Sequence, residues 1–243
     1  MNIRSFLCGI LLLLPTIAPA EELTVILYTN GYPPYSFPKE SPYKGIYLDI
    51  LEEVANITGD KFVAKYYPAK RKLKAFESGL MHIEPGVNPA WRKSWKDISV
   101  YSIPFGVFTD VIFFKKGNQF SPVGPNDLKG KKILTVRGYR YPIYESNFQN
   151  NSIIRYDINN EFQMMNFLFS KNRDADAGFI NKDILRYYMN ESKMKFHIGD
   201  PIGEVPVTFR FHINKKHVIK RFNSALTSLI NNGTIESIIK KYQ

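Results

Sequence analysis

The amino-acid sequence predicts an α/β protein made of two lobes, on three observations. Short apolar runs rich in Val, Ile, Tyr and Phe alternate with amphipathic segments at helical spacing, which is typical of β-α-β units. The alternation occurs twice, on either side of a polar passage at residues 117–131. A late strand and a closing helix pair then return the chain to the first half. We therefore expect two lobes, each a β-sheet flanked by helices.

The first 20 residues predict a cleavable export signal. Arg4 supplies a positive charge, Phe6 to Ile17 is an apolar run too short to cross a bilayer, and Ala18-Pro19-Ala20 has the small residues of a cleavage site. Cys8, the only cysteine, lies inside this segment. We expect a mature, cysteine-free chain in the periplasm, an oxidising compartment.

The net charge of the chain indicates which classes of binding partner to expect. The full sequence carries 33 Lys and Arg against 22 Asp and Glu, for a net charge of +11; without Arg4 the count is 32 against 22, or +10. The lysines are scattered, so the pattern does not indicate a nucleic-acid-binding protein. No later apolar run approaches the roughly 18 residues of a membrane span. The excess positive charge favours attraction to anionic solutes or to a membrane surface.

The first lobe is predicted to alternate strands and helices. A β-branched run predicts a strand, a loop with two prolines follows it, and an apolar stripe that ends at a glycine predicts the first helix. A second strand and a short helix complete a β-α-β-α alternation. These segments are Leu23–Tyr28, Tyr32-Pro33-Pro34-Tyr35, Gly45–Gly59, Phe62–Tyr67 and Lys70–Ser78.

The stretch from Gly79 to Phe105 organises the predicted site. It contains a helix-ending glycine, a short strand, and a Gly/Pro/Asn loop that presents Arg92 between two tryptophans. The fork of donors on an arginine matches a carboxylate bidentately. We therefore expect this loop to hold a small carboxylate.

The second lobe repeats the plan. An apolar strand at 107–114 leads through the linker to a strand at 132–136, a loop with arginines and aromatic residues, helices at 160–169 and 181–189, and a strand between them. A strand at 207–213 and helices at 217–229 and 234–242 close the chain. We expect lobe 1 at 21–115 plus 207–243, lobe 2 at 116–206, and two segments crossing between them.

The ordered set of loop residues resembles the family 3 extracellular solute-binding proteins, the periplasmic amino-acid-binding group. The resemblance covers essentially the whole mature chain, and no single mark is specific. The marks are Tyr32-Pro33-Pro34-Tyr35, Gly45 to Asp49, Gly79, Arg92, Ser102 to Phe105, Asp127 to Lys131, Asp176, Asn223, Leu226, Gly233, Ile235, Ile238 and Tyr242.

The resemblance implies a type II periplasmic-binding-protein clamshell that closes on its ligand. Arg92 would bind the carboxylate of the ligand, and Tyr35 or Tyr32 would stack on it. It also implies a monomer that works with an inner-membrane ABC permease or a sensor protein, without a metal or cofactor. The candidate ligand-binding residues are Arg92, Tyr35, Tyr32, Asn88, Arg71, Arg137, Tyr139 and Asn181.

Three departures from the family pattern bear on the ligand. The acid that would hold an amino group falls at Asn181, which is uncharged, and the acid expected after Gly79 is His82. Arg92 lies ten residues before Ser102, where the family spacing is seven, unless Ser99 is the true match. With Arg71, Arg137 and Arg140 as further arginines, we expect an anionic or zwitterionic ligand with more negative than positive charge.

A cyclohexadienyl-dehydratase-like enzyme on the same fold is the alternative. It would need a general acid or base, for which Glu84, His82 and Asp176 are the candidates. His197, His212 and His217 lack metal-ligand spacing, and the sequence contains no phosphate loop or nucleophile motif. The sequence favours a binding protein over an enzyme.

Overall fold

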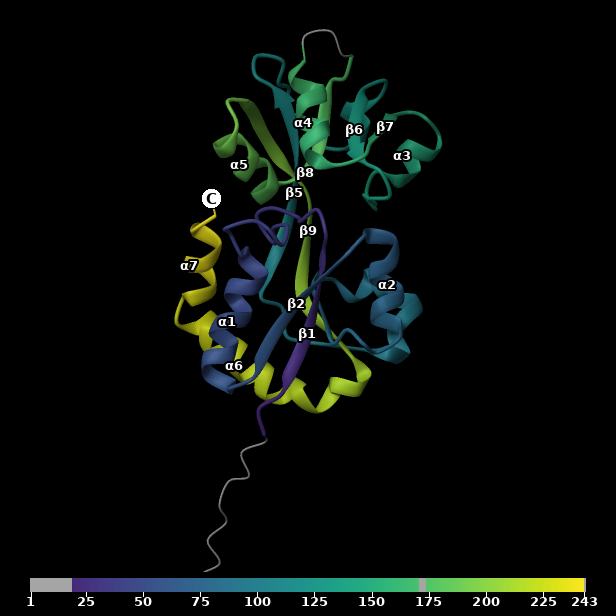
Figure 1. Cartoon of the computed structure of the whole chain (residues 1–243). Coiled ribbons are helices and arrows are strands. Elements are labelled where there is room, and N and C mark those ends of the chain that lie inside the picture. Colours follow the sequence, from purple (N-terminus) through teal and green to yellow (C-terminus); the bar gives the residue numbers. More distant parts are fainter. Residues whose placement is uncertain (1–18, 171–173, 243) are drawn as a thin grey trace, which may run out of the picture.

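The protein folds into two α/β lobes joined by two strands, as Figure 1 shows for the computed structural model. The structure describes residues 19–170 and 174–242. The connecting strands are β5 (Gly106–Lys115) and β9 (Phe196–His212). This arrangement confirms the predicted two-lobed α/β fold. Most of the expected export signal, including Arg4 and Cys8, lies outside the described residues.

Lobe 1 is built from both ends of the chain. Its first strand lies between the next two and runs parallel to both. Helices α1, α6 and α7 lie on one side of the sheet and α2 on the other (Figure 1). The elements are β1 (Glu22–Tyr28), α1 (Ile46–Thr58), β2 (Lys61–Tyr67), α2 (Ala69–Glu77), β3 (Ile83–Val87), the 3-10 segment η1 (Pro89–Ile98), β4 (Ser99–Tyr101), the 3-10 segment η3 (Ile213–Val218), α6 (Ile219–Asn231) and α7 (Thr234–Lys240).

Lobe 2 repeats the arrangement with the middle of the chain. Its strand β6 runs parallel to β7 and β8. The elements are the 3-10 segment η2 (Pro125–Leu128), β6 (Lys132–Val136), α3 (Glu145–Gln149), β7 (Ile154–Ile158), α4 (Glu161–Phe169), β8 (Ala177–Asn181) and α5 (Lys182–Glu191). Within the described ranges, each helix is too short or too polar to cross a membrane.

The strand β9 connects the sheets of the two lobes. The strand order is β2-β1-β3-β9-β5-β8-β6-β7, with β4 also paired to β9. Residues 196–207 of β9 pair with β5, whereas residues 208–211 pair with β3. The sequence predicted a strand only at 207–213. The extra length arises because β5 supplies a partner for a segment whose glycines and prolines otherwise indicate loops.

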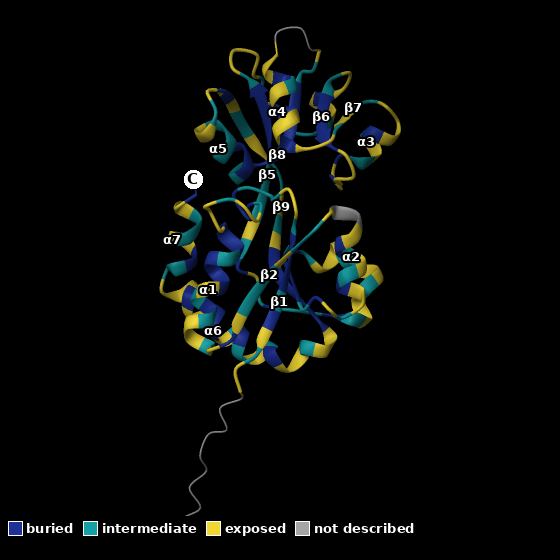
Figure 2. Cartoon of the chain, in the orientation of Figure 1, coloured by how far each residue is buried: buried dark blue, intermediate teal, exposed yellow. Residues whose placement is uncertain are grey.

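Buried apolar side chains line the strands and the inner faces of the helices. Figure 2 shows the central strands largely buried and the outer helix faces exposed. Helix α1 illustrates the cause, because Ile46, Ile50 and Val54 recur at helical spacing and are at most 1 % exposed. Gly59 ends this helix at φ 77°, and its N–H donates to Ala55 O at 2.8 Å. The predicted helix and its glycine stop are confirmed.

Candidate functional site

Tyr35 of lobe 1 reaches across to lobe 2. Its hydroxyl donates to Asp183 Oδ2 at 2.7 Å and lies 3.3 Å from Asn181 Oδ1. The ring is 3 % exposed and packs on Tyr47 and Phe108, with centroid separations of 5.4 and 4.6 Å. The rings fix the hydroxyl at the meeting point of the lobes. We call this region the interlobe seam and define it as Tyr32, Tyr35, Asp110, Tyr139, Glu161, Asn181 and Asp183.

A second set of polar side chains lies at the seam. Tyr32, from the loop after β1, lies close to Tyr139 of lobe 2, whose hydroxyl donates to Glu161 Oε1 at 2.7 Å. Glu161 is the first residue of α4, directly after the N-cap Asn160. It is 9 % exposed, and burial raises the pKa of its carboxyl although the Tyr139 hydrogen bond partly offsets the effect. Tyr139 therefore lies between a desolvated acid of lobe 2 and a tyrosine of lobe 1.

Asp110 is a second acid at the seam. It lies in β5 directly opposite Asn181 of β8 in an antiparallel pair. Opposed residues in such a pair project from the same face of the sheet. Burial and the nearby Glu161 carboxylate raise the pKa of Asp110 from 3.8 to about 6. Among the residues that the structure describes, neither Asp110 nor Glu161 forms an ion pair with a basic side chain.

The oxygen of the Asn181 side-chain amide has hydrogen-bond partners, whereas its nitrogen has none in the described part of the chain. Its Oδ1 accepts from the backbone N–H groups of Asp183 and Ile184, at 3.0 and 3.3 Å, and so caps helix α5. Its Nδ2 is buried and has no hydrogen-bond partner in the described part of the chain. A buried donor without a partner is costly, typically about 1–3 kcal/mol. The Nδ2 group is therefore a candidate ligand donor.

Glu84 anchors a cluster of three cations in lobe 1. Arg92 donates to it from Nε and Nη2 at 3.2 and 2.8 Å, and Arg210 donates from Nη1 at 2.8 Å. Lys72 Nζ lies 3.2 Å from Glu84 Oε1. Burial alone would raise the pKa of Glu84, but the three cations hold it well below its usual range. By formal charges this cluster carries a net +2.

Arg92 thus has an internal partner that sequence reasoning did not find. Its side chain is 19 % exposed, the most accessible of the three cations, and Nη1 also donates to Trp91 O at 3.2 Å. The Trp91 ring packs near Phe108, 6.5 Å between centroids, and Phe108 contacts Tyr35. Arg92 as the carboxylate-binding residue stays a prediction.

The structure separates the other predicted residues from the seam. Asn88 caps η1 by accepting from Ala90 N at 2.9 Å, and its Nδ2 donates to Pro206 O at 2.8 Å. Arg71 is exposed in the first turn of α2. Arg137 lines a hollow of about 560 Å³ between β7 and α4, and no seam residue lines that hollow. Tyr32, Tyr35, Tyr139 and Asn181 do meet.

The charges at the seam differ from the expected excess of arginines. The ionisable groups that meet there are the acids Asp110, Glu161 and Asp183, whereas Arg71 and Arg137 lie elsewhere. Sequence reasoning missed these acids because each sits in an element that appeared structural. One signal was present, since Asp110 is a lone acid inside an apolar strand.

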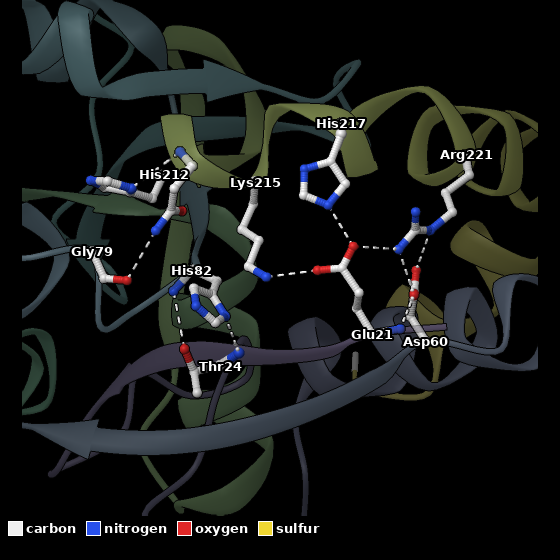
Figure 3. Close-up of polar contacts among 10 residues, drawn as sticks. Glu21, Thr24, Asp60, Gly79, His82, His212, Lys215, His217 and Arg221 are labelled. Atoms are coloured by element: carbon white, nitrogen blue, oxygen red, sulfur yellow. Dashed lines mark hydrogen bonds and ion pairs between the residues drawn. The ribbon is translucent and has the colours of Figure 1, made fainter. Parts of the chain in front are cut away.

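The candidates for a general acid or base in an enzyme have structural partners. Glu84 is held by three cations, and Asp176 accepts from Lys131 Nζ at 3.1 Å and from Lys132 N at 2.8 Å. His82 Nδ1 accepts from Thr24 N at 3.1 Å, as Figure 3 shows. These contacts give Glu84, Asp176 and His82 a structural role that does not require catalysis.

Other contacts in Figure 3 form a polar cluster around Glu21. Lys215, His217 and Arg221 all contact the Glu21 carboxylate. Burial would raise the pKa of Glu21, but these hydrogen bonds lower it to about 2. The backbone N–H of Glu21 donates to Asp60 Oδ1 at 2.9 Å. The cluster fixes the start of β1 against η3 and the first turn of α6.

Comparison with known proteins gives a family match over nearly the whole described chain. The family model of the bacterial extracellular solute-binding proteins, family 3, matches residues 24–243. A probable histidine-binding protein of Campylobacter jejuni is 24 % identical over 216 residues, which cover 88 % of this chain and 82 % of that protein.

Solved structures share the fold at low sequence identity. A probable amino-acid ABC transporter extracellular-binding protein of Bacillus subtilis has a TM-score of 0.76 at 19 % identity, covering 92 % of this chain and 99 % of the other. The VFT2 domain of Bordetella pertussis BvgS has a TM-score of 0.72 at 20 % identity, covering 91 % and 93 %.

Proposed function

Because this chain belongs to the bacterial extracellular solute-binding proteins of family 3, we propose that it is a non-enzymatic receptor for a small carboxylate-bearing solute. The solute would be an amino acid or a related organic acid. One observation carries the proposal: Tyr35 of lobe 1 bonds to Asn181 and Asp183 of lobe 2. Polar groups from both lobes therefore converge where a trapped solute would contact both.

Arg92 is the group that we propose for the solute carboxylate. Glu84 keeps Lys72 and Arg210 as partners if Arg92 turns away, so releasing Arg92 does not leave the buried acid unpaired. The cluster has a net positive formal charge, which favours an anionic group beside it. Tyr35 and Tyr32 would supply ring faces, and the acids of lobe 2 favour a zwitterion over a dianion.

Closure of the lobes is the proposed signal to a membrane partner. We propose that residues 21–115 plus 207–243 move as one body and residues 116–206 as the other, with β5 and β9 between them. The monomeric closed form would then be recognised by an ABC permease or a sensor protein. By their names, the Bacillus subtilis protein and a structurally similar histidine kinase sensor domain represent these two settings.

A thermal-shift panel of amino acids, dicarboxylates and hydroxy acids tests the proposal. At least one compound should raise the melting temperature of the wild-type protein, because a ligand that binds only the folded state stabilises it. Arg92→Ala should abolish that rise while the ligand-free protein stays folded. Lys93→Ala removes a neighbouring exposed charge and should retain the rise. No rise with any compound would overturn the proposed function, and an undiminished rise in Arg92→Ala would remove Arg92 from the site.

Export to the periplasm is part of the same proposal. Cleavage after Ala20 would turn the backbone nitrogen of Glu21 into an ammonium group. That nitrogen already donates to Asp60 Oδ1, so the new charge would meet a carboxylate. Intact-mass measurement on protein released by osmotic shock should give the chain beginning at Glu21. Full-length protein confined to the cytoplasmic fraction would contradict export.

A further inference from the structure

We infer that Asp110 of the connecting strand β5, with Glu161 and Asn181 of lobe 2, forms a subsite that takes a positively charged side-chain group of the solute. An ammonium, guanidinium or imidazolium group fits the chemistry. The inference rests on the proposed function and adds the class of ligand to it. It reverses the sequence-based expectation that an uncharged residue at position 181 turns the site towards anions.

The geometry brings the three side chains together. Asp110 and Asn181 are opposed across β5 and β8, which places their Cβ atoms about 5 Å apart on one face. Asp110 is close enough to Glu161 for the Glu161 carboxylate to raise the pKa of Asp110. The Asn181 amide contacts Tyr35 of lobe 1, so this face looks towards the opposite lobe. The subsite therefore lies where a solute held between the lobes would meet it.

The lack of a basic partner distinguishes the buried Glu161 and the half-buried Asp110 from the buried acids elsewhere in the described chain. Asp49 is paired with Lys241, Asp60 with Arg221, and Glu84 with three cations. Glu161 is 9 % exposed, as deeply buried as Asp49, yet neither it nor Asp110 has a cationic partner among the described residues. A buried carboxylate is costly unless it is paired with a cation. A cation on the solute would supply the missing partner to both.

The unpartnered Nδ2 of Asn181 is an independent sign of a ligand. Asn181 is 6 % exposed, and the nitrogen is buried beside Asp110 without an acceptor in the described chain. A solute that brings an oxygen to this donor and a side-chain cation to the two acids would satisfy both together.

Aromatic rings complete the surroundings of the subsite. Tyr32 stacks on Tyr35 at 5.7 Å between centroids, and Tyr35 packs on Phe108 at 4.6 Å. Phe108 and Asp110 are two residues apart on β5 and so share a face. Ring faces attract cations and repel anions. The rings therefore reinforce the preference that the acids create.

Calorimetric titration with matched solutes tests the inference. The probes are L-lysine, L-arginine and L-histidine, with L-glutamine as a neutral control and L-glutamate and succinate as acidic controls. At least one basic amino acid should bind about tenfold or more tightly than glutamine, and the acids more weakly still. Binding of glutamine or glutamate without any basic compound would overturn the subsite and keep the proposed function. Binding of nothing would overturn both.

Two conservative variants test whether Asp110 and Glu161 cause the preference for a basic solute. Asp110→Asn and Glu161→Gln should each weaken binding of the preferred basic amino acid about tenfold or more, while the affinity for glutamine changes little. Asp174→Asn removes an exposed acid of lobe 2 and should bind as the wild type does. Asp110→Asn removes a half-buried charge without a cationic partner in the described chain, so we expect it to melt no lower than the wild type. Unchanged affinity for the basic solute in both variants would overturn the inference.

Discussion

Glu84→Gln is expected to lower the free energy of unfolding by about 3–5 kcal/mol. The carboxylate is 1 % exposed and is the shared partner of Lys72, Arg92 and Arg210. Arg210 is fully buried, and its Nη2 already lacks a partner in the described chain. A neutral amide would leave two buried cations uncompensated. Urea unfolding of the two proteins at pH 7 measures the difference.

The pH dependence of that difference follows from the depressed pKa. An acid whose pKa is lower in the folded than in the unfolded state stabilises the protein fully above its unfolded value, here near 4.5. The stability is lost as the pH falls from there through the folded pKa. The gap between wild type and Glu84→Gln should therefore be constant from about pH 7 to 5 and shrink below 4.5.

Two further variants test whether the loss of stability in Glu84→Gln comes from the buried cations that Glu84 neutralises. Glu236→Gln alters an exposed ion pair with Lys240 and should leave unfolding unchanged. Adding Arg210→Met to Glu84→Gln should recover part of the loss, because it removes a buried charge that no longer has a partner. A loss below about 1 kcal/mol in Glu84→Gln, or no recovery in the double variant, would contradict the assigned role.

Gly86→Ala is expected to lower the free energy of unfolding by about 3 kcal/mol and to weaken solute binding. Gly86 has φ +71°, and a Cβ there would lie 2.5 Å from Tyr47 Cζ and closer still to the hydroxyl oxygen. Tyr47 is 5 % exposed and stacks on Tyr35, so it cannot move without disturbing the seam. Chemical unfolding and a solute titration report the two effects.

The controls separate the steric clash from backbone strain. Gly117 has φ +94° with nothing within 4 Å of its would-be Cβ, so Gly117→Ala should cost only the strain, roughly 1 kcal/mol. Adding Tyr47→Phe to Gly86→Ala removes the closest clashing atom and should restore part of the stability. Equal losses at the two glycines would show that contact with Tyr47 is unimportant.

Local patterns predicted much of the fold. Helix α1 follows from its apolar stripe and from Gly59, which takes the left-handed conformation that ends a helix. Strand β1 likewise follows from an apolar run of strand length. Residues 196–206 of β9 could not be predicted, because Gly199, Pro201 and Pro206 indicate loops. Pairing with β5 overrides that local preference.

The site was predictable only where its residues share a loop. Tyr32 and Tyr35 were found from their stiff loop after the first strand, and Asn181 from the family pattern. Asp110 and Glu161 were missed because they are 51 positions apart in the sequence and meet only through the packing of α4 on β5. The Arg92 partner Glu84 was treated as a candidate catalytic acid instead.

Two α/β lobes of the family 3 solute-binding type were predictable from the order of residues along the chain. Hydrophobic periodicity and turn residues act over a few positions, so they can be read directly. Which charges remain unpaired depends instead on how distant segments pack. Glu84 meets Arg210 across 126 positions, whereas Asp110 and Glu161 meet no cation in the described chain. The net charge of a site depends on distances between remote residues, which local patterns do not contain.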